Sequence, residues 1–274
     1  TDSIALEYRV DPTNNVTLAV GARHDNNDVF DDANTWKFEG IYRLDDSTRL
    51  RGSVGTAIKN PTFSELYGIY SGFESNPDLT PEKSQSWELG IDKGLLDDRL
   101  ELRATYFSAE LEDEIATAFK CVQNCDNADW MDDVWASSPG NIQGISKQKG
   151  LELASSWLIN DFFVMDASYT YSDATQEGVD EVRRANNIGS VNLLWRSTGD
   201  FTLNANAQYN GSQTDNGGVT LDAFTLVNLN ASWTATDKLN VYLRLDNLFD
   251  ESYQEVFGYQ TLGFGASLGL RFSL

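Results

Sequence analysis

The chain has 274 residues, a hydrophobic fraction of 41% and a formal net charge of −22. No segment approaches the ~18 consecutive apolar residues of a membrane helix, which excludes a helical membrane protein but not a membrane β-barrel. The charge argues against nucleic acid as a partner, because no basic patch is available to neutralise phosphates.

Apolar and polar residues alternate with a period of two through nearly the whole chain. The last segment is the clearest case, where Phe264, Leu268, Leu270 and Phe272 alternate with glycine, serine and arginine. Most alternating segments are about 9–13 residues long, the length that a tilted strand needs to cross a bilayer. Aromatic residues near the segment ends resemble interfacial girdles. The pattern therefore predicts an all-β transmembrane barrel with an apolar face toward lipid and a polar face toward a wet lumen.

Thirteen antiparallel strands are predicted within one domain that spans residues 1–274. Their expected ranges are 3–10, 15–24, 34–43, 48–56, 85–93, 98–110, 147–157, 161–172, 185–196, 200–210, 222–234, 239–247 and 262–274. The intervening connections alternate between short turns and long loops, of which 57–84 and 111–146 are the longest. Short periplasmic turns and long extracellular loops are typical of outer-membrane barrels. On this basis residue 1 lies outside the cell and the C-terminus, Leu274, lies in the periplasm.

The odd number of strands indicates a barrel that continues beyond this chain. A complete bacterial barrel normally has an even strand count, whereas the first and last of thirteen strands run parallel. An open sheet in lipid leaves two edges of unsatisfied backbone groups. We therefore expect the C-terminal part of a longer barrel, and the start at Thr1, which carries no signal peptide, agrees with that.

Neither the cysteines nor the acidic runs predict a metal site or a cofactor. Cys121 and Cys125 have no nearby histidine and are too few for a four-ligand zinc site, so a small loop-closing disulfide is expected. The acidic runs within 25–32 and 126–133 are interpreted as solvated loops. Calcium is the alternative for these loops, but neither has the spacing of an EF-hand.

The sequence offers no catalytic constellation. The one histidine, His24, is expected on the lipid face near the rim, and no serine is spaced to pair with it. The charged residues on the polar face are interpreted as a lumen wall. We therefore do not expect an enzyme.

Three motifs go beyond a generic barrel. They are residues 51–67, which end in Asn-Pro-Thr-Phe-Ser-Glu-Leu-Tyr, residues 76–84 with Asn-Pro-Asp-Leu-Thr-Pro-Glu, and residues 246–253 with Asp-Asn-Leu-Phe-Asp-Glu-Ser-Tyr. In this order they resemble the C-terminal half of TonB-dependent outer-membrane receptors. The resemblance implies a 22-stranded barrel around an N-terminal plug, of which this chain supplies roughly the last thirteen strands and no plug.

Within that family the chain is most similar to cobalamin receptors. The segment 247–261 looks like their C-terminal signature, and Arg183-Arg184-Ala185 resembles a run near their ligand site. The resemblance makes Arg183 and Arg184 candidate ligand contacts. Strand parity directs Arg183 toward lipid unless a bulge intervenes, and Arg184 inward, so rim arginines that meet lipopolysaccharide phosphates remain the alternative.

The resemblance implies TonB-driven uptake of a scarce, large nutrient, and the similarity to cobalamin receptors favours a corrinoid such as cobalamin. A siderophore or haem receptor of the same family and a passive porin-like barrel are the open alternatives, because loop sequences decide the ligand. The expected partners are cobalamin or another metal chelate, TonB through the absent plug, and outer-membrane lipid with lipopolysaccharide.

Overall fold

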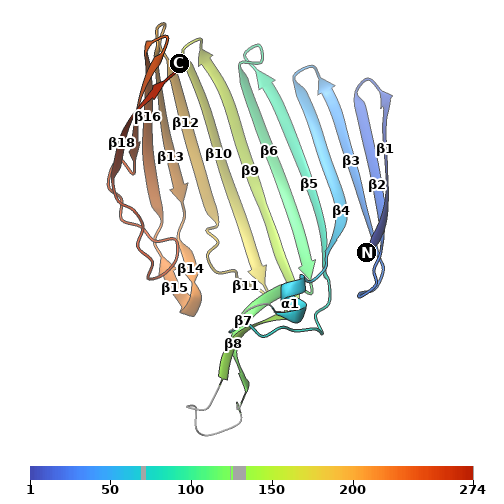
Figure 1. The fold of residues 1–274 in the computed structure, drawn as a ribbon. Helices are drawn as coiled ribbons and strands as arrows, with labels where there is room; N and C mark the ends of the chain where they lie inside the picture. The colour runs from blue at the N-terminus through green and yellow to red at the C-terminus, as the bar shows by residue number, and fades with distance from the viewer. Residues whose placement is uncertain (69–71, 124, 126–133, 274) are drawn as a thin grey trace.

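The computed structural model describes residues 1–68, 72–123, 125 and 134–273 (Figure 1). One large antiparallel sheet holds thirteen strands in an unbroken path, and one further short strand, β11 (Val179–Asp180), pairs with β10. The path runs through β1 (Asp2–Thr13), β2 (Val16–Asn26), β3 (Ala33–Asp45), β4 (Thr48–Lys59), β5 (Glu82–Leu95), β6 (Leu100–Glu112), β9 (Ile145–Asn160), β10 (Phe163–Gln176), β12 (Asn187–Arg196), β13 (Phe201–Asn210), β16 (Phe224–Thr236), β17 (Leu239–Asp246) and β18 (Gly265–Phe272).

The thirteen predicted strands are confirmed as the thirteen strands of this path. Each strand pairs with the next one of the path, and β1 and β18 form the two free edges of an open, curved sheet. Several strands exceed the predicted ranges, because alternation alone does not show where backbone pairing ends. One example is β9, which begins at Ile145 and ends at Asn160.

Further small elements lie inside segments that the sequence assigns to loops. β7 (Ile115–Gln123) and β8 (Val134–Asn141) form a separate hairpin, and β14 (Gln213–Asp215) pairs with β15 (Val219–Leu221). A short helix, α1 (Phe63–Tyr67), follows β4. None of these elements is a strand of the main sheet, with one side toward the apolar face and the other toward the polar face. The alternation of apolar and polar residues therefore does not reveal them.

The registers give the main sheet one apolar face. Residues that face each other across neighbouring strands form continuous apolar rows, such as Tyr8–Val20–Phe38–Val54–Trp87, Leu89–Tyr106–Leu151–Tyr171 and Ala167–Val191–Ala207–Val227. Many of these side chains are exposed, with Leu89 61% accessible. An apolar sheet face of this extent requires a nonpolar surrounding, as in the lipid-facing band of a membrane barrel.

The opposite face is polar and carries the arginines. Within the main-sheet strands that the structure describes, every arginine has the parity of this face: Arg9, Arg23, Arg43, Arg49, Arg51, Arg103, Arg196, Arg244 and Arg271. Lysines lie on both faces. Lys37 and Lys59 share the parity of the arginines, whereas Lys83, Lys93, Lys147 and Lys149 have the parity of the apolar face, close to its ends. A lysine stem packs along apolar surface while its ammonium reaches a polar layer, which suits a rim position.

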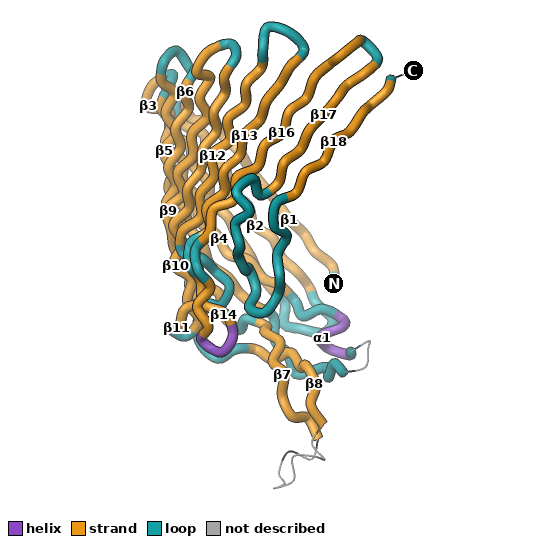
Figure 2. Tube along the Cα trace, turned by 90° about the vertical axis from the view of Figure 1, so that its left-hand side faces the viewer, coloured by secondary structure: helices purple, strands orange, loops and turns teal. Residues whose placement is uncertain are grey.

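The two ends of the sheet differ. Figure 1 shows the short turns at the top and the long connections at the bottom, with the N-terminus at the lower end and the C-terminal strand ending at the upper one. Figure 2 shows that the β7–β8 hairpin projects beyond the long-loop end. Leu274 lies outside the described residues. None of the helices in the described part of the chain has the length and apolar character of a membrane span.

Candidate functional site

The first family-like motif forms a capped turn of helix at the long-loop end. Thr62 is the N-cap of α1, and a capping box joins it to Glu65, whose carboxylate accepts from the Thr62 backbone N–H at 2.6 Å. Burial raises the pKa of Glu65, but the hydrogen bonds from Thr62 outweigh it and lower that pKa overall. Leu66 is buried beneath the turn. The motif therefore ends β4 and fixes the direction in which the chain leaves the sheet.

The second motif is a strap that anchors the β7–β8 hairpin. The Thr80 backbone N–H donates to Asn141 Oδ1 at 2.8 Å, and Asn141 Nδ2 donates to the carbonyls of Thr80 and Asp113 at 2.9 and 2.7 Å. Asn76 Nδ2 donates to the Pro139 carbonyl at 3.2 Å. Leu79 of the same segment is buried. The Asn-Pro-x-Leu-x-Pro-Glu segment thus holds the base of the most prominent projection of this end.

The projecting hairpin carries an aromatic pair and the cysteines. Phe119 and Trp135 stack with ring centroids 5.7 Å apart and are 70% and 51% exposed. A disulfide joins Cys121 to Cys125, the pairing expected from their spacing, with Cα atoms 5.7 Å apart. The acidic run expected at 126–133 lies outside the described residues.

The two predicted ligand arginines lie together in the loop before β12, but neither follows strand parity. The strand begins at Asn187, later than the predicted residue 185, so the inference that Arg183 points toward lipid and Arg184 inward does not apply. Arg184 Nε contacts Glu181 Oε2 at 2.5 Å, and its side chain is 55% exposed. Arg183 Nε contacts Asp215 Oδ1 at 2.7 Å.

Asp215 is a residue that the sequence does not single out. Its side chain has no exposed surface, and it accepts from the Phe257 and Asn216 backbone N–H groups, both at 2.6 Å, besides Arg183. The hydrogen bond from Phe257, those from Asn216 and Arg183 and the charge of Arg183 lower the pKa of Asp215 against the opposing effect of burial. The run Asp-Asn-Gly-Gly signals a turn here, but nothing in it indicates the distant partners.

A second charged feature lies on the polar face toward the short-turn end. Asp92, whose side chain is 6% exposed, accepts from Arg49 Nε at 2.6 Å and from Arg51 Nε at 3.4 Å. Arg51 also donates to Thr105 Oγ1 and lies 3.6 Å from Glu88 Oε1. Charged side chains directly opposite each other on strands stabilise a sheet only where the signs differ, so Asp92 compensates the two arginines of β4.

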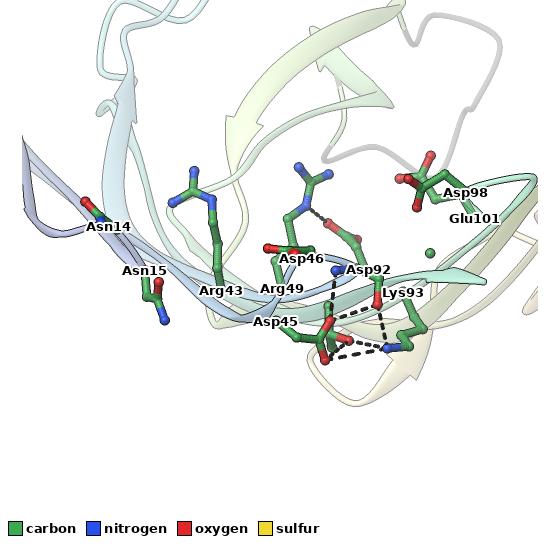
Figure 3. A pocket seen from close by; sticks show the side chains of 13 residues that line it. Asn14, Asn15, Arg43, Asp45, Asp46, Arg49, Asp92, Lys93, Asp98 and Glu101 are labelled. Atoms are coloured by element: carbon green, nitrogen blue, oxygen red, sulfur yellow. Dashed lines mark hydrogen bonds and ion pairs between the residues drawn. The ribbon is translucent and has the colours of Figure 1, made fainter. Parts of the chain in front are cut away.

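A hollow of about 620 Å³ lies beside this cluster, at the short-turn end of the sheet (Figure 3). Arg43 and Arg49 face each other across β3 and β4 and both project into it. Lys93 closes one side through Ser47 Oγ at 2.8 Å and Asp45 at 3.7 Å. The side chains that line the hollow include both basic and acidic groups, as expected for the polar wall of a lumen. Among the described residues no group of three histidine, cysteine or acidic side chains could hold a metal ion.

His24 lies on the apolar face near the long-loop end, as predicted from its parity. Its Nδ1 lies 3.0 Å from Asn34 Oδ1 on the neighbouring strand. This cross-strand contact accounts for the histidine at the rim.

Two curated relatives are similar along most of the chain. The vitamin B12 transporter BtuB of Photobacterium profundum is 31% identical over 256 residues, which cover 91% of this chain and 40% of that protein. The vitamin B12 transporter BtuB of Vibrio vulnificus is 31% identical over 252 residues, or 88% of this chain and 36% of that protein. The chain therefore spans less than half the length of these relatives.

Solved structures show the same fold at lower identity. The ferric enterobactin receptor PfeA of Pseudomonas aeruginosa superposes with a TM-score of 0.80 at 20% identity, over 99% of this chain and 44% of that one. The siderophore receptor PirA of Acinetobacter baumannii gives 0.78 at 18% identity, over 99% and 45%. The family model for the TonB-dependent receptor-like β-barrel matches residues 1–248. This chain belongs to the TonB-dependent receptor β-barrel family, whose members lie in the bacterial outer membrane.

Proposed function

We propose that the chain is the C-terminal barrel part of a receptor that takes up a corrinoid such as cobalamin across the outer membrane. The observation that carries the proposal is the 31% identity to vitamin B12 transporters, which extends over nine-tenths of the chain. The siderophore receptors share the fold at 18–20% identity, which does not transfer their ligands.

In this proposal the two ends of the sheet have different roles. The long-loop end faces the outside and receives the ligand, and the short-turn end, where the final strand ends, faces the periplasm. The polar face lines the lumen, where its charged residues contact a plug contributed by another part of the receptor. TonB pulls on that plug to release the ligand inward. Outer-membrane lipid and lipopolysaccharide cover the apolar face.

Arg184 is the stronger of the two proposed ligand contacts. Its side chain is 55% exposed and its ion-pair partner, Glu181, lies within the same loop. Arg183 is engaged by a fully covered carboxylate, so fewer of its donors are available to a ligand. We retain both residues as candidates and expect Arg184 to matter more for direct contact.

Direct binding to the intact receptor tests the ligand. Cyanocobalamin is titrated into detergent-solubilised receptor, with a ferric catecholate siderophore as competitor, and Arg183→Ala and Arg184→Ala are measured beside the parent. We expect binding that the siderophore does not displace, and weaker binding in Arg184→Ala. Absence of cobalamin binding by the parent contradicts the corrinoid proposal, whereas unchanged affinity in both variants contradicts only the proposed contacts.

Uptake measurements separate a receptor from a passive pore. Cells that carry the intact receptor are supplied with labelled cobalamin, with and without a functional TonB. A receptor accumulates the label only when TonB is present, whereas equal accumulation in both strains indicates a porin-like barrel.

A further inference from the structure

Asp215 connects three loops that are far apart in the sequence. One of its oxygens accepts from Arg183 in the loop before β12, and the other accepts from the Phe257 backbone N–H in the loop between β17 and β18. The third donor, the Asn216 N–H, belongs to its own β14–β15 hairpin. All three partners are donors and the carboxylate has no exposed surface, so every contact depends on its two acceptor oxygens.

Further contacts follow the same path between the loops. The Arg183 backbone N–H donates to the Thr214 carbonyl at 2.7 Å, and Gln213 Nε2 donates to the Glu255 carbonyl at 3.0 Å. The rings of Phe224 and Tyr253 lie with centroids 4.4 Å apart. Each of the outer two loops is therefore joined to the β14–β15 hairpin by more than one bond, and the hairpin lies between them.

Arg183 adopts a backbone conformation that supports a positioning role. Its φ is +60°, in the left-handed region that residues other than glycine, asparagine and aspartate rarely adopt. Such a conformation persists only where surrounding contacts stabilise it. The backbone and guanidinium contacts to Thr214 and Asp215 provide that stabilisation, and they hold the guanidinium against the carboxylate.

We propose that Asp215 and Arg183 form a clasp that holds residues 181–186, 213–221 and 253–262 in one preassembled unit at the mouth of the receptor. Arg183 is then a positioning residue that acts through Asp215, and the ligand meets three loops that are already ordered. This inference rests on the proposed function only in naming the ligand; the coupling of the loops does not depend on it.

Preassembly determines what the clasp contributes to binding. A ligand that must order loops when it binds loses part of its interaction free energy to that ordering. If only a fraction of the receptor has the three loops assembled, the apparent dissociation constant rises by the inverse of that fraction. Loss of the clasp therefore weakens binding without removal of any group that touches the ligand.

Hydrogen–deuterium exchange of the intact receptor, without ligand, tests the coupling. Asp215→Asn replaces an acceptor oxygen with an NH₂ group in a site whose partners all donate. We expect amides in 181–186 and 253–262 to exchange about ten-fold faster or more, the scale of a lost hydrogen bond to a charged group. Arg183→Asn keeps a residue that tolerates positive φ but removes the guanidinium, and should affect 213–221 as well.

A matched control variant distinguishes loss of the clasp from a general increase in the exchange of the loop amides. Glu181→Gln removes the ion pair with Arg184, which lies within a single loop, and should leave exchange in 213–221 and 253–262 unchanged. Faster exchange in Asp215→Asn that is confined to 213–221, or that appears equally in Glu181→Gln, overturns the clasp.

Binding of cyanocobalamin to the same variants distinguishes positioning from contact. A positioning role predicts that Arg183→Asn weakens binding and loosens the other two loops together. Weaker binding with unchanged exchange assigns Arg183 to direct contact and overturns its positioning role. Failure of the parent to bind cobalamin contradicts the proposed function, and the exchange measurements still decide the clasp.

Discussion

The carboxylate of Asp92 provides a quantitative test of the charged lumen wall. Asp92→Asn preserves the volume of the side chain but removes the charge that lies between Arg49 and Arg51. The 2.6 Å bond from Arg49 is a hydrogen bond between charged groups, for which losses of about 1.5–3 kcal/mol are typical. Because half of the Arg49 side chain is exposed, we take the lower end, about 1.5 kcal/mol. The longer contact with Arg51 adds about 0.5 kcal/mol, for a total near 2 kcal/mol.

Urea unfolding of the intact receptor, followed by tryptophan fluorescence, measures this loss. Glu110→Gln is the matched control, since its 3.0 Å pair with Lys147 is exposed on both sides and should contribute at most about 0.5 kcal/mol. The Asp92→Asn difference should persist in 1 M salt, which screens exposed pairs more than covered ones. An Asp92→Asn loss no larger than that of Glu110→Gln would refute the idea that Asp92 compensates the arginines.

The assignment of the two faces and the protonation of the clasp give two further predictions. Leu153→Arg on the apolar face of β9 should destabilise the barrel in lipid vesicles by about 2–4 kcal/mol. Thr170→Arg, on the polar face opposite Glu152, should be tolerated. Equal losses of stability in the two variants, measured by reversible unfolding, would contradict the assignment of the two faces. The pKa of Asp215 is lowered from 3.8, first by the hydrogen bond from Phe257, so the clasp is fully present above 3.8 and is lost as the pH falls through the lower folded pKa. Exchange protection of 253–262, corrected for intrinsic rates, should therefore be constant from pH 7 to 5, and loss of protection within that range would contradict this protonation state.

The strands were predictable because each one meets two fixed surroundings. Along β12, the alternate residues Val191, Leu193 and Trp195 face lipid, while the residues between them face the polar side. This contrast appears directly as alternation in the sequence. The number and order of the strands follow from that rule. Their exact ends do not, because pairing continues into segments such as 145–147, where the environment no longer changes sharply.

The loops at the mouth were less predictable because their contacts are distant in the sequence. Asp215 binds a backbone N–H 42 residues later and a guanidinium 32 residues earlier, and no local pattern encodes either contact. Strand parity does not apply to Arg183, because β12 begins only at Asn187. The family motifs indicated the correct segments, but only the structure shows that one caps a helix and another anchors a hairpin.

The restriction of arginine to one face of the main sheet, while lysine occurs on both, has a practical consequence for barrels of this kind. A guanidinium stays charged at any accessible pH and is costly at mid-membrane depth, so within these strands its parity identifies the water-facing side even where the apolar residues are ambiguous. A single arginine in a strand can thus fix the register of a neighbouring segment whose alternation is weak. Sequence comparisons that exchange arginine for lysine freely would erase this information.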